Sequence, residues 1–164
     1  MITQRIIGID PGSRITGYGI IDSDGQNTHL VEAGCIRLKE ASFSLRLKRL
    51  FDEITGICRQ HQPISGSVEQ VFYARNVRSA LQLGQVRGVI LLSLIHSNCE
   101  VFEYSALEVK SAVTGYGRAE KHQVRKMIEL MVRGDFSNTR YDLTDALGLA
   151  VTHAQVSTFR SKLK

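Results

Sequence analysis

The sequence predicts an α/β protein with a mixed five-stranded sheet flanked by helices. Three short runs rich in β-branched residues open the chain and are separated by turn signals, a pattern typical of an antiparallel meander. Two further short strand-like runs each follow a segment with helical spacing, and strands joined by a helical crossover pair in parallel. The chain has 164 residues, of which 43% are hydrophobic and 23% charged. We therefore expect residues 1–164 to form one domain with its own core.

The stretch from Arg5 to Gly12 predicts a central strand that ends in a tight turn. Its three isoleucines are β-branched and favour a strand that is covered on both faces. Pro11 has no N–H to donate and Gly12 tolerates unusual backbone angles, so the strand ends there. Asp10 is then expected at the carboxyl end of the strand, the edge at which open α/β sheets bind ligands. An aspartate before Pro-Gly can equally serve only to start the turn.

The next two strands complete the meander. Residues 15–21 are expected to return beside the first strand, with glycines where the backbones approach closely. Asp24 and Gly25 form a strong hairpin signal, so residues 29–38 are expected to form the third strand. Both pairings are therefore antiparallel.

Helices and parallel strands are expected to alternate in the rest of the chain. Ser42 and Ser44 can cap a helix that runs to about residue 61 with apolar side chains on one face. A strand over residues 67–72 follows, and Asn76 can cap a second long helix that ends near residue 97. The remaining expected elements are a strand over 100–103, a helical turn from 106, a helix over 121–132, a last helix from 142 to beyond 153, and a basic tail that frays from about 157.

Composition limits the classes of protein to which the chain can belong. The net charge of +5 favours an anionic partner, nucleic acid first, although many proteins with such a charge bind none. The three cysteines lie far apart, which argues against a disulfide framework or a zinc site and is typical of reduced thiols in a cytoplasmic protein. The first residues lack the apolar core of a signal peptide, and no apolar run is long enough to span a membrane.

Three further acidic residues are candidates to join Asp10. Glu69 is expected inside a strand beside the first, where acidic residues are depleted, but it can equally be an edge residue or the partner of an arginine. Asp142 and Asp145 lie three residues apart at the start of the last helix, so they share one face. Acidic residues are also common there simply because negative charge is favourable at a helix N-terminus. Taken singly, each signal is weak.

As a group, these carboxylates indicate a metal centre. A cluster without His or Cys partners suits a hard cation such as Mg²⁺ or Mn²⁺, and without a cation the carboxylates would repel one another. Two ions about 4 Å apart can activate water and stabilise the leaving oxygen of a phosphodiester. A strand-end Asp, a Glu on the neighbouring strand and a late helix that carries Asp form the layout of ribonuclease-H-like nucleases.

Longer ordered segments resemble one family closely. These segments are GIDPGSRITGYG (8–19), EQVFYARNVRSALQLGQVRG (69–88), VFEYS (101–105), VTGYGRAEKHQV (113–124) and DLTDALGLAVTH (142–153). With them, the chain resembles the RuvC family of bacterial Holliday-junction resolvases over nearly its whole length.

The resemblance implies a function and a set of partners. It implies a ribonuclease-H-like fold and a homodimeric, Mg²⁺-dependent endodeoxyribonuclease that nicks four-way DNA junctions in pairs during recombination and repair. It assigns the catalytic and metal-binding roles to Asp10, Glu69, Asp142 and Asp145, with two ions per subunit. It places the dimer contact on the helix after Asn76, and it implies the branch-migration proteins RuvA and RuvB as partners.

The resemblance also implies which residues face DNA. Phe72 alone would be read as a core residue, but the family uses an aromatic here against DNA near the cut, where stacking on a base is worth about 1–3 kcal/mol. Basic and polar side chains around it and around the later glycine-containing loop can hold phosphates, although solvated helix faces often look similar. The predicted DNA-facing residues are Phe72, Tyr73, Arg75, Asn76, Arg78, Lys110, Arg118 and Lys121.

Three other functions remain open from the sequence. An ATPase of the actin and sugar-kinase type also has an Asp-x-Gly turn, but it needs two copies of the domain, and this chain is short and has no repeat. A catalytically silent DNA-binding module would be marked by the loss of a carboxylate, and all four are present. A related nuclease that acts on RNA is disfavoured by Phe72 but is not excluded by composition.

Overall fold

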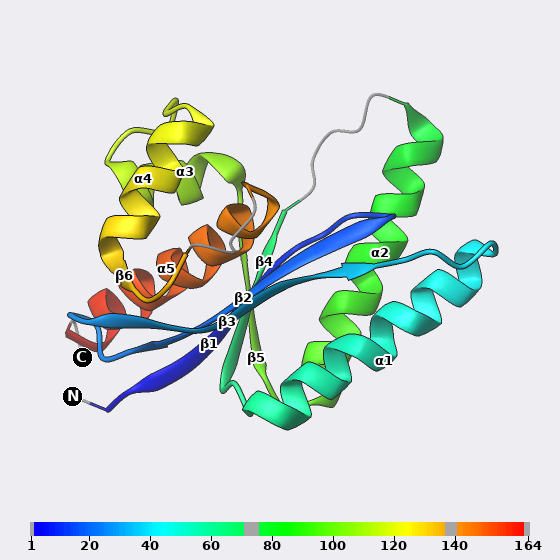
Figure 1. The fold of residues 1–164 in the computed structure, drawn as a ribbon, viewed down its shortest axis with the longest axis horizontal. Helices are drawn as coiled ribbons and strands as arrows, with labels where there is room; N and C mark the ends of the chain where they lie inside the picture. Colours follow the sequence, from blue (N-terminus) through cyan, green and yellow to red (C-terminus); the bar gives the residue numbers. More distant parts are fainter. Residues whose placement is uncertain (1, 71–75, 137–140, 163–164) are drawn as a thin grey trace.

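The computed structural model describes residues 2–70, 76–136 and 141–162, with the side chains of 141, 142 and 159–162 left out. The strands and helices alternate much as the sequence predicts (Figure 1). The strands are β1 (Gln4–Asp10), β2 (Ile15–Ser23), β3 (Thr28–Arg37), β4 (Ser65–Glu69), β5 (Glu100–Tyr104) and β6 (Val132–Arg133). The helices are α1 (Phe43–His61), α2 (Val77–His96), α3 (Ala106–Thr114), α4 (Lys121–Met131) and α5 (Tyr141–Lys162).

The sheet is mixed, and its strand order is β5-β4-β1-β2-β3-β6. The meander is confirmed, because β1 with β2 and β2 with β3 pair antiparallel. The parallel pairs of β1 with β4 and of β4 with β5 are confirmed too. β1 therefore lies centrally, and Ile9 faces Val68 in the register, so Asp10 and Glu69 end neighbouring strands at the same edge.

The sequence-based prediction of five strands is wrong by one strand. β6 has two residues and pairs parallel with β3 directly after α4. Two residues are too few to show strand periodicity, so only the tertiary structure reveals it. The strand expected over 67–72 begins earlier, as β4 at Ser65, because Ser and Gly are weak strand formers and gave no local signal.

Helices cover both faces of the sheet and give two apolar cores (Figure 1). α3, α4 and α5 pack on one face with Ile6, while α1 and α2 pack on the other with Ile7 and Ile9. Alternate side chains of β1 thus enter opposite cores, as expected of a strand covered on both faces.

α5 approaches the sheet unusually closely, and glycine makes this possible. A Cβ atom on Gly8 would lie 2.0 Å from the carbonyl oxygen of Ala146 and 2.8 Å from the amide nitrogen of Ala150. Gly19, which faces Gly8 across β1 and β2, leaves room for the side chain of Leu147. The start of α5 is thereby held against the carboxyl half of β1.

Helix ends confirm one predicted cap and correct another. The Asn76 side chain accepts a hydrogen bond from the Ser79 N–H at 2.8 Å. Ser42 occupies the N-cap of α1, but its hydroxyl makes no capping bond and lies 2.7 Å from the hydroxyl of Ser44. The last helix runs to Lys162, past residue 157, at which the sequence predicts a tail.

Candidate active site

Asp10 ends β1 on a turn that is tied down from β2. The Gly12 N–H donates to the Thr16 hydroxyl at 3.3 Å, and that hydroxyl donates to the Gly12 carbonyl at 3.0 Å. Thr16 is fully buried, so water does not compete for these bonds. The turn after Asp10 is therefore fixed by the core.

Two further carboxylates meet Asp10 from other elements. Glu69 ends β4, the parallel neighbour of β1, and Asp145 lies one turn into α5, which packs on β1. The three side chains line one cavity of about 300 Å³ between β1, β4, α3, α4 and α5. The other residues that line it are Ala106, Val109, Lys110, Lys121, Val124, Thr144 and Leu149.

The carboxylates strongly affect one another's pKa values. The pKa of Asp10 is raised to about 7, first by burial and then by the negative charges of Glu69 and Asp145. Burial also raises the pKa of Glu69. The protonated Asp10 carboxyl donates a hydrogen bond to Glu69, so the pair holds a proton near neutral pH. Full ionisation of this cluster requires a compensating positive charge.

Part of that positive charge comes from two lysines. The Lys121 ammonium lies 3.1 Å from a carboxylate oxygen of Asp145, and this hydrogen bond raises the pKa of Lys121. Lys110 lines the same cavity from α3. Both lysines were predicted to contact phosphate, and the structure places both beside the carboxylates.

The donor set fits a hard divalent cation, although the described residues do not complete it. Within the described part of the chain, no three Asp, Glu, His or Cys side chains are arranged as a ready ligand group. The side chain of Asp142, the fourth predicted carboxylate, lies outside the described residues. Asp10, Glu69 and Asp145 offer only oxygen donors, as Mg²⁺ and Mn²⁺ prefer. A cation bound there would replace the proton that Asp10 shares with Glu69.

The remaining predicted residues either do not line the cavity or lie outside the described residues. Asn76 and Arg78 are exposed at the start of α2, and Arg118 is exposed between α3 and α4. Phe72, Tyr73 and Arg75 fall on residues that the structure does not describe.

The sequence did not identify the apolar walls of the cavity. Val109 of α3 and Leu149 of α5 are buried and line it. Such walls reduce the solvation of Asp10, which is the largest cause of its raised pKa. Leu149 lies four residues after Asp145, so helical spacing alone could have indicated that they share a face.

A buried hydrogen-bonded pair, Tyr104 and His153, lies next to the strand end that carries Glu69. The Tyr104 hydroxyl and Nδ1 of His153 are 2.8 Å apart, and the His153 ring stacks on Phe102 at 4.0 Å between centroids. Tyr104 is the register partner of Glu69, and its carbonyl accepts from the Gln70 N–H at 2.9 Å. This pair joins β5 to α5 next to the point where Glu69 ends its strand.

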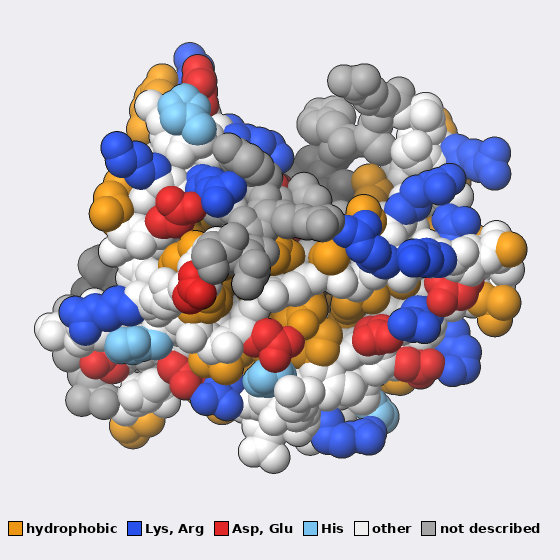
Figure 2. Space-filling model, viewed as in Figure 1, with side chains coloured by type: hydrophobic (Ala, Val, Ile, Leu, Met, Phe, Trp, Pro, Cys, Tyr) orange, Lys and Arg blue, Asp and Glu red, His pale blue; other side chains and the backbone are white. Residues whose placement is uncertain are grey.

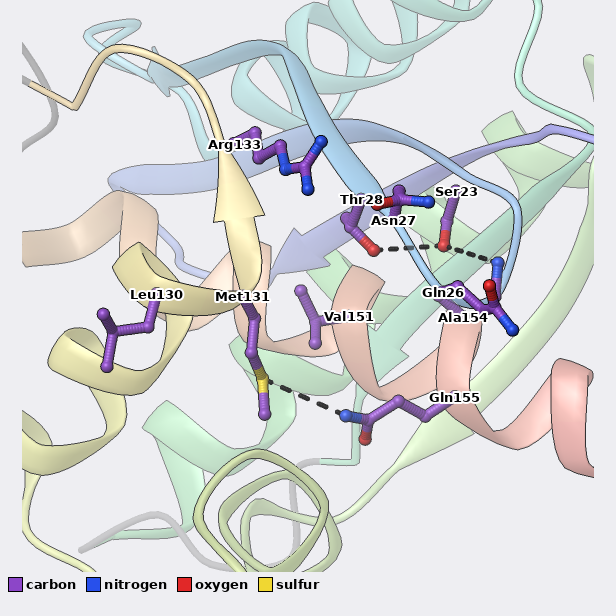
Figure 3. A pocket seen from close by; sticks show the side chains of 11 residues that line it. Ser23, Gln26, Asn27, Thr28, Leu130, Met131, Arg133, Val151, Ala154 and Gln155 are labelled. Atoms are coloured by element: carbon purple, nitrogen blue, oxygen red, sulfur yellow. Dashed lines mark hydrogen bonds between the residues drawn. The ribbon is translucent and has the colours of Figure 1, made fainter.

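A second cavity, separate from the one that contains Asp10, lies at the carboxyl end of β2. It has a volume of about 280 Å³, and Ser23, Thr28, Met131 and Gln155 are among its lining residues (Figure 3). The hydroxyls of Ser23 and Thr28 are 3.1 Å apart and satisfy each other. None of the predicted site residues lines this cavity.

The raised pKa of Asp10 predicts how stability depends on pH. The unfolded chain loses this proton near pH 4, whereas the folded chain keeps it until about pH 7. The metal-free protein is therefore expected to lose stability as pH rises from 4 to 7, by roughly 1–4 kcal/mol, and to recover it in Mg²⁺. Urea unfolding at pH 5 and pH 8, with chelator or with Mg²⁺, measures this.

Two variants control for other titrating groups. Asp10→Asn is expected to remove most of the loss, because its side chain carries no charge at either pH. Asp52→Asn, on the exposed Lys48–Asp52 pair of α1, is expected to keep the wild-type dependence. Equal pH dependence in all three proteins would contradict the prediction.

Residues 6–153 match the family described as crossover junction endodeoxyribonuclease RuvC. Curated proteins of that name from Shewanella piezotolerans and Shewanella pealeana are 48% and 47% identical to the chain. The first alignment covers 90% of this chain and 85% of the relative, and the second covers 93% and 87%.

Solved structures share the fold. Thermus thermophilus RuvC in complex with a Holliday junction substrate superposes with a TM-score of 0.89 at 24% identity, covering 96% of this chain and 97% of that one. The yeast mitochondrial Holliday junction resolvase Ydc2 gives a TM-score of 0.66 at 14% identity, over 97% and 84%. With a family match over most of its length and relatives at nearly half identity, the chain belongs to the RuvC family of crossover junction endodeoxyribonucleases.

Proposed function

We propose that this chain resolves four-way DNA junctions by paired, symmetric, metal-dependent nicking in DNA recombination and repair. The observation that carries the proposal is the convergence of Asp10, Glu69 and Asp145 from β1, β4 and α5 on one cavity. Relatives that carry the name of crossover junction endodeoxyribonuclease supply the substrate class.

Asp10, Glu69, Asp142 and Asp145 are the proposed catalytic residues and would hold two Mg²⁺ ions, which Mn²⁺ can replace. The bound ions supply the positive charge that activates water and stabilises the leaving oxygen. Burial of Asp10 and Glu69 makes their carboxylates depend on that charge. Val109 and Leu149 limit the water around them and so strengthen the electrostatic interactions.

The lysines of the cavity have a positioning role in this proposal. Lys121 forms an ion pair with Asp145, and Lys110 lines the same cavity. A scissile phosphate would be bound between them, because an ammonium is a compact point charge that contacts phosphate oxygens. These contacts position the backbone and read no sequence.

The DNA surface extends to both sides of the cavity. Lys and Arg side chains lie over α3 and α4 on one side and over α1 and α2 on the other (Figure 2). The proposed contacts beyond the lysines are Phe72, Tyr73, Arg75, Asn76, Arg78 and Arg118, with Phe72 stacked on an unpaired base. Binding would then weaken steeply as salt rises.

A homodimer through α2 would present two such sites. Four large side chains on one face of α2 are exposed: Val77 76%, Leu81 65%, Leu92 58% and Ile95 61%. Gly84 and Gly88 lie on the same face, and a Cβ atom on either would meet nothing within 4 Å. An apolar helix stripe with small central residues suits close packing against a second copy of itself. A two-fold dimer matches the two symmetric cuts.

Leu81→Asp is expected to convert the dimer to a monomer and to uncouple the two nicks. A charge on each copy within this stripe would be desolvated by the contact with the second copy. Light scattering after size exclusion gives the mass, and a supercoiled cruciform distinguishes single from paired nicks. Leu130→Asp, at a 71% exposed position of α4, is the matched control and is expected to remain dimeric. If the Leu81→Asp variant has the mass of a dimer, the proposed interface through α2 is wrong.

The setting of the proposed activity is the cytoplasm, with RuvA and RuvB as partners at the junction. No helix among the described residues is long and apolar enough to cross a membrane. Cys35, Cys58 and Cys99 are free thiols, as is usual in a reducing compartment.

The proposal is tested with a synthetic four-way junction, a linear duplex of the same sequence and an RNA–DNA hybrid. Junction-selective, symmetric nicks that require Mg²⁺ are expected. Equal cleavage of the linear duplex or the hybrid would leave a ribonuclease-H-like nuclease without junction selectivity. Junction binding without cleavage in Mg²⁺ or Mn²⁺ would indicate a DNA-binding module.

A further inference from the structure

The connection between α3 and α4 exposes an aromatic side chain beside the cavity. Tyr116 is 60% exposed, and Leu107, in the first turn of α3, is 62% exposed. Gly117, which follows Tyr116, lets the loop approach Leu107, because a Cβ atom on Gly117 would lie 3.2 Å from the Leu107 side chain and 2.9 Å from the Ser111 hydroxyl. Large apolar side chains are usually buried, so two exposed neighbours form a small apolar surface.

The backbone that carries Tyr116 is held in place by its own hydrogen bonds. The Thr114 hydroxyl has two carbonyl acceptors for its single proton, that of Lys110 at 2.8 Å and that of Tyr116 at 3.0 Å, and it accepts from the Tyr116 N–H at 3.2 Å. The Ala119 N–H donates to the Tyr116 carbonyl at 3.1 Å. Gly115 caps α3 with a φ of 75°, which other residues adopt only with strain. A fixed loop loses little entropy when it binds a partner.

Positive charge surrounds this surface on the side of the cavity. Lys110 and Lys121, which line the cavity, lie on either side of the loop in the sequence, and Arg118 is exposed within it. The nearby acids are already engaged: Glu108 accepts from Ser105, and Glu120 lies 3.3 Å from His122. In Figure 1 this connection and the start of α2 both lie at the upper end of the molecule. An aromatic among cations suits a polyanion with apolar faces.

We propose that Tyr116 packs its ring on the deoxyribose of the DNA strand that enters the cavity and donates its hydroxyl to a phosphate, with Leu107 extending the apolar contact. The inference rests on the proposed function and assigns a DNA contact to a residue outside the carboxylate cluster. Tyrosine is a common donor to phosphate, and such a contact fixes orientation without reading sequence. Lys110, Arg118 and Lys121 favour DNA as the occupant over an apolar protein surface.

Fluorescence provides a direct test, because the chain contains no tryptophan. Tyr116→Trp would be a single reporter, and its emission is expected to change on titration with a four-way junction in chelator. Leu130→Trp, at a 71% exposed position of α4, is the control and is expected not to respond. Normal junction binding by Tyr116→Trp with unchanged emission would overturn the inference.

Affinity measurements distinguish the contribution of the Tyr116 ring to junction binding from that of its hydroxyl. Tyr116→Ala is expected to bind the junction about 5- to 20-fold more weakly, and Tyr116→Phe about 2- to 5-fold. The melting temperature is expected to stay at the wild-type value, because the ring is exposed. Wild-type affinity of Tyr116→Ala would overturn this inference alone, whereas a wild-type chain that binds no junction would overturn the proposed function and this inference together.

Discussion

Asp10→Asn is expected to reduce Mg²⁺-dependent junction cleavage by on the order of 1,000-fold while the junction is still bound. Asp10 ends the central strand and interacts with Glu69 and Asp145 at once, so its loss removes a shared donor. An amide retains the shape and the neutral form of the side chain but cannot supply negative charge to a cation. The substitution is therefore expected to slow the chemical step rather than to weaken junction binding.

Single-turnover cleavage and a binding titration on the same junction separate these effects. Binding in chelator is expected to be equal or tighter, because one negative charge near the phosphate is removed. Asp52→Asn, far from the cavity on α1, is the control and is expected to cleave at the wild-type rate. Asp10→Asn cleavage within tenfold of wild type would show that Asp10 is not a ligand for the catalytic ions.

Gly8→Ala is expected to destabilise the protein by more than about 3 kcal/mol, a large part of the stability of a typical domain. The new Cβ would lie 2.0 Å from the carbonyl oxygen of Ala146 and 2.8 Å from the amide of Ala150. Both atoms belong to the α5 backbone, so no change of rotamer can relieve the clash. α5 must move away from β1, which also separates Asp145 from Asp10.

Urea unfolding measures the stability, and the rise of melting temperature in Mg²⁺ reports on the site. The free energy of unfolding and the rise of melting temperature in Mg²⁺ are both expected to be smaller in Gly8→Ala than in wild type. Gly56→Ala is the matched control, because Gly56 lies on the exposed side of α1 with nothing within 4 Å of a new Cβ. It is expected to stabilise α1 by about 0.5–1 kcal/mol. A Gly8→Ala midpoint equal to that of wild type would show that α5 does not depend on this contact.

Strong local signals allowed much of the fold to be predicted from the sequence. The isoleucines before Asp10, the Asp24-Gly25 turn and the Asn76 cap each determine structure within a few residues, and all three are confirmed. β6 and the early start of β4 were missed, because their strand conformation comes from pairing with distant partners rather than from their own residues.

The site was predictable in part for the same reason. The end of the first strand indicated where Asp10 lies, and helix periodicity placed Asp145. Glu69 was expected inside a neighbouring strand, and the structure shows that β4 ends at this residue. The ion pair of Lys121 with Asp145 and the wall formed by Val109 and Leu149 join segments far apart in sequence. Only the packed structure brings these segments together and reveals how burial raises the pKa of Asp10.

The close contact of α5 with β1 has a consequence for the protein during its synthesis. Asp10 and Glu69 leave the ribosome well before Asp145, and the cavity is complete only when α5 reaches Gly8. A nascent or truncated chain that lacks α5 has strands but no closed site. The last helix to be synthesised therefore brings the third carboxylate to the other two.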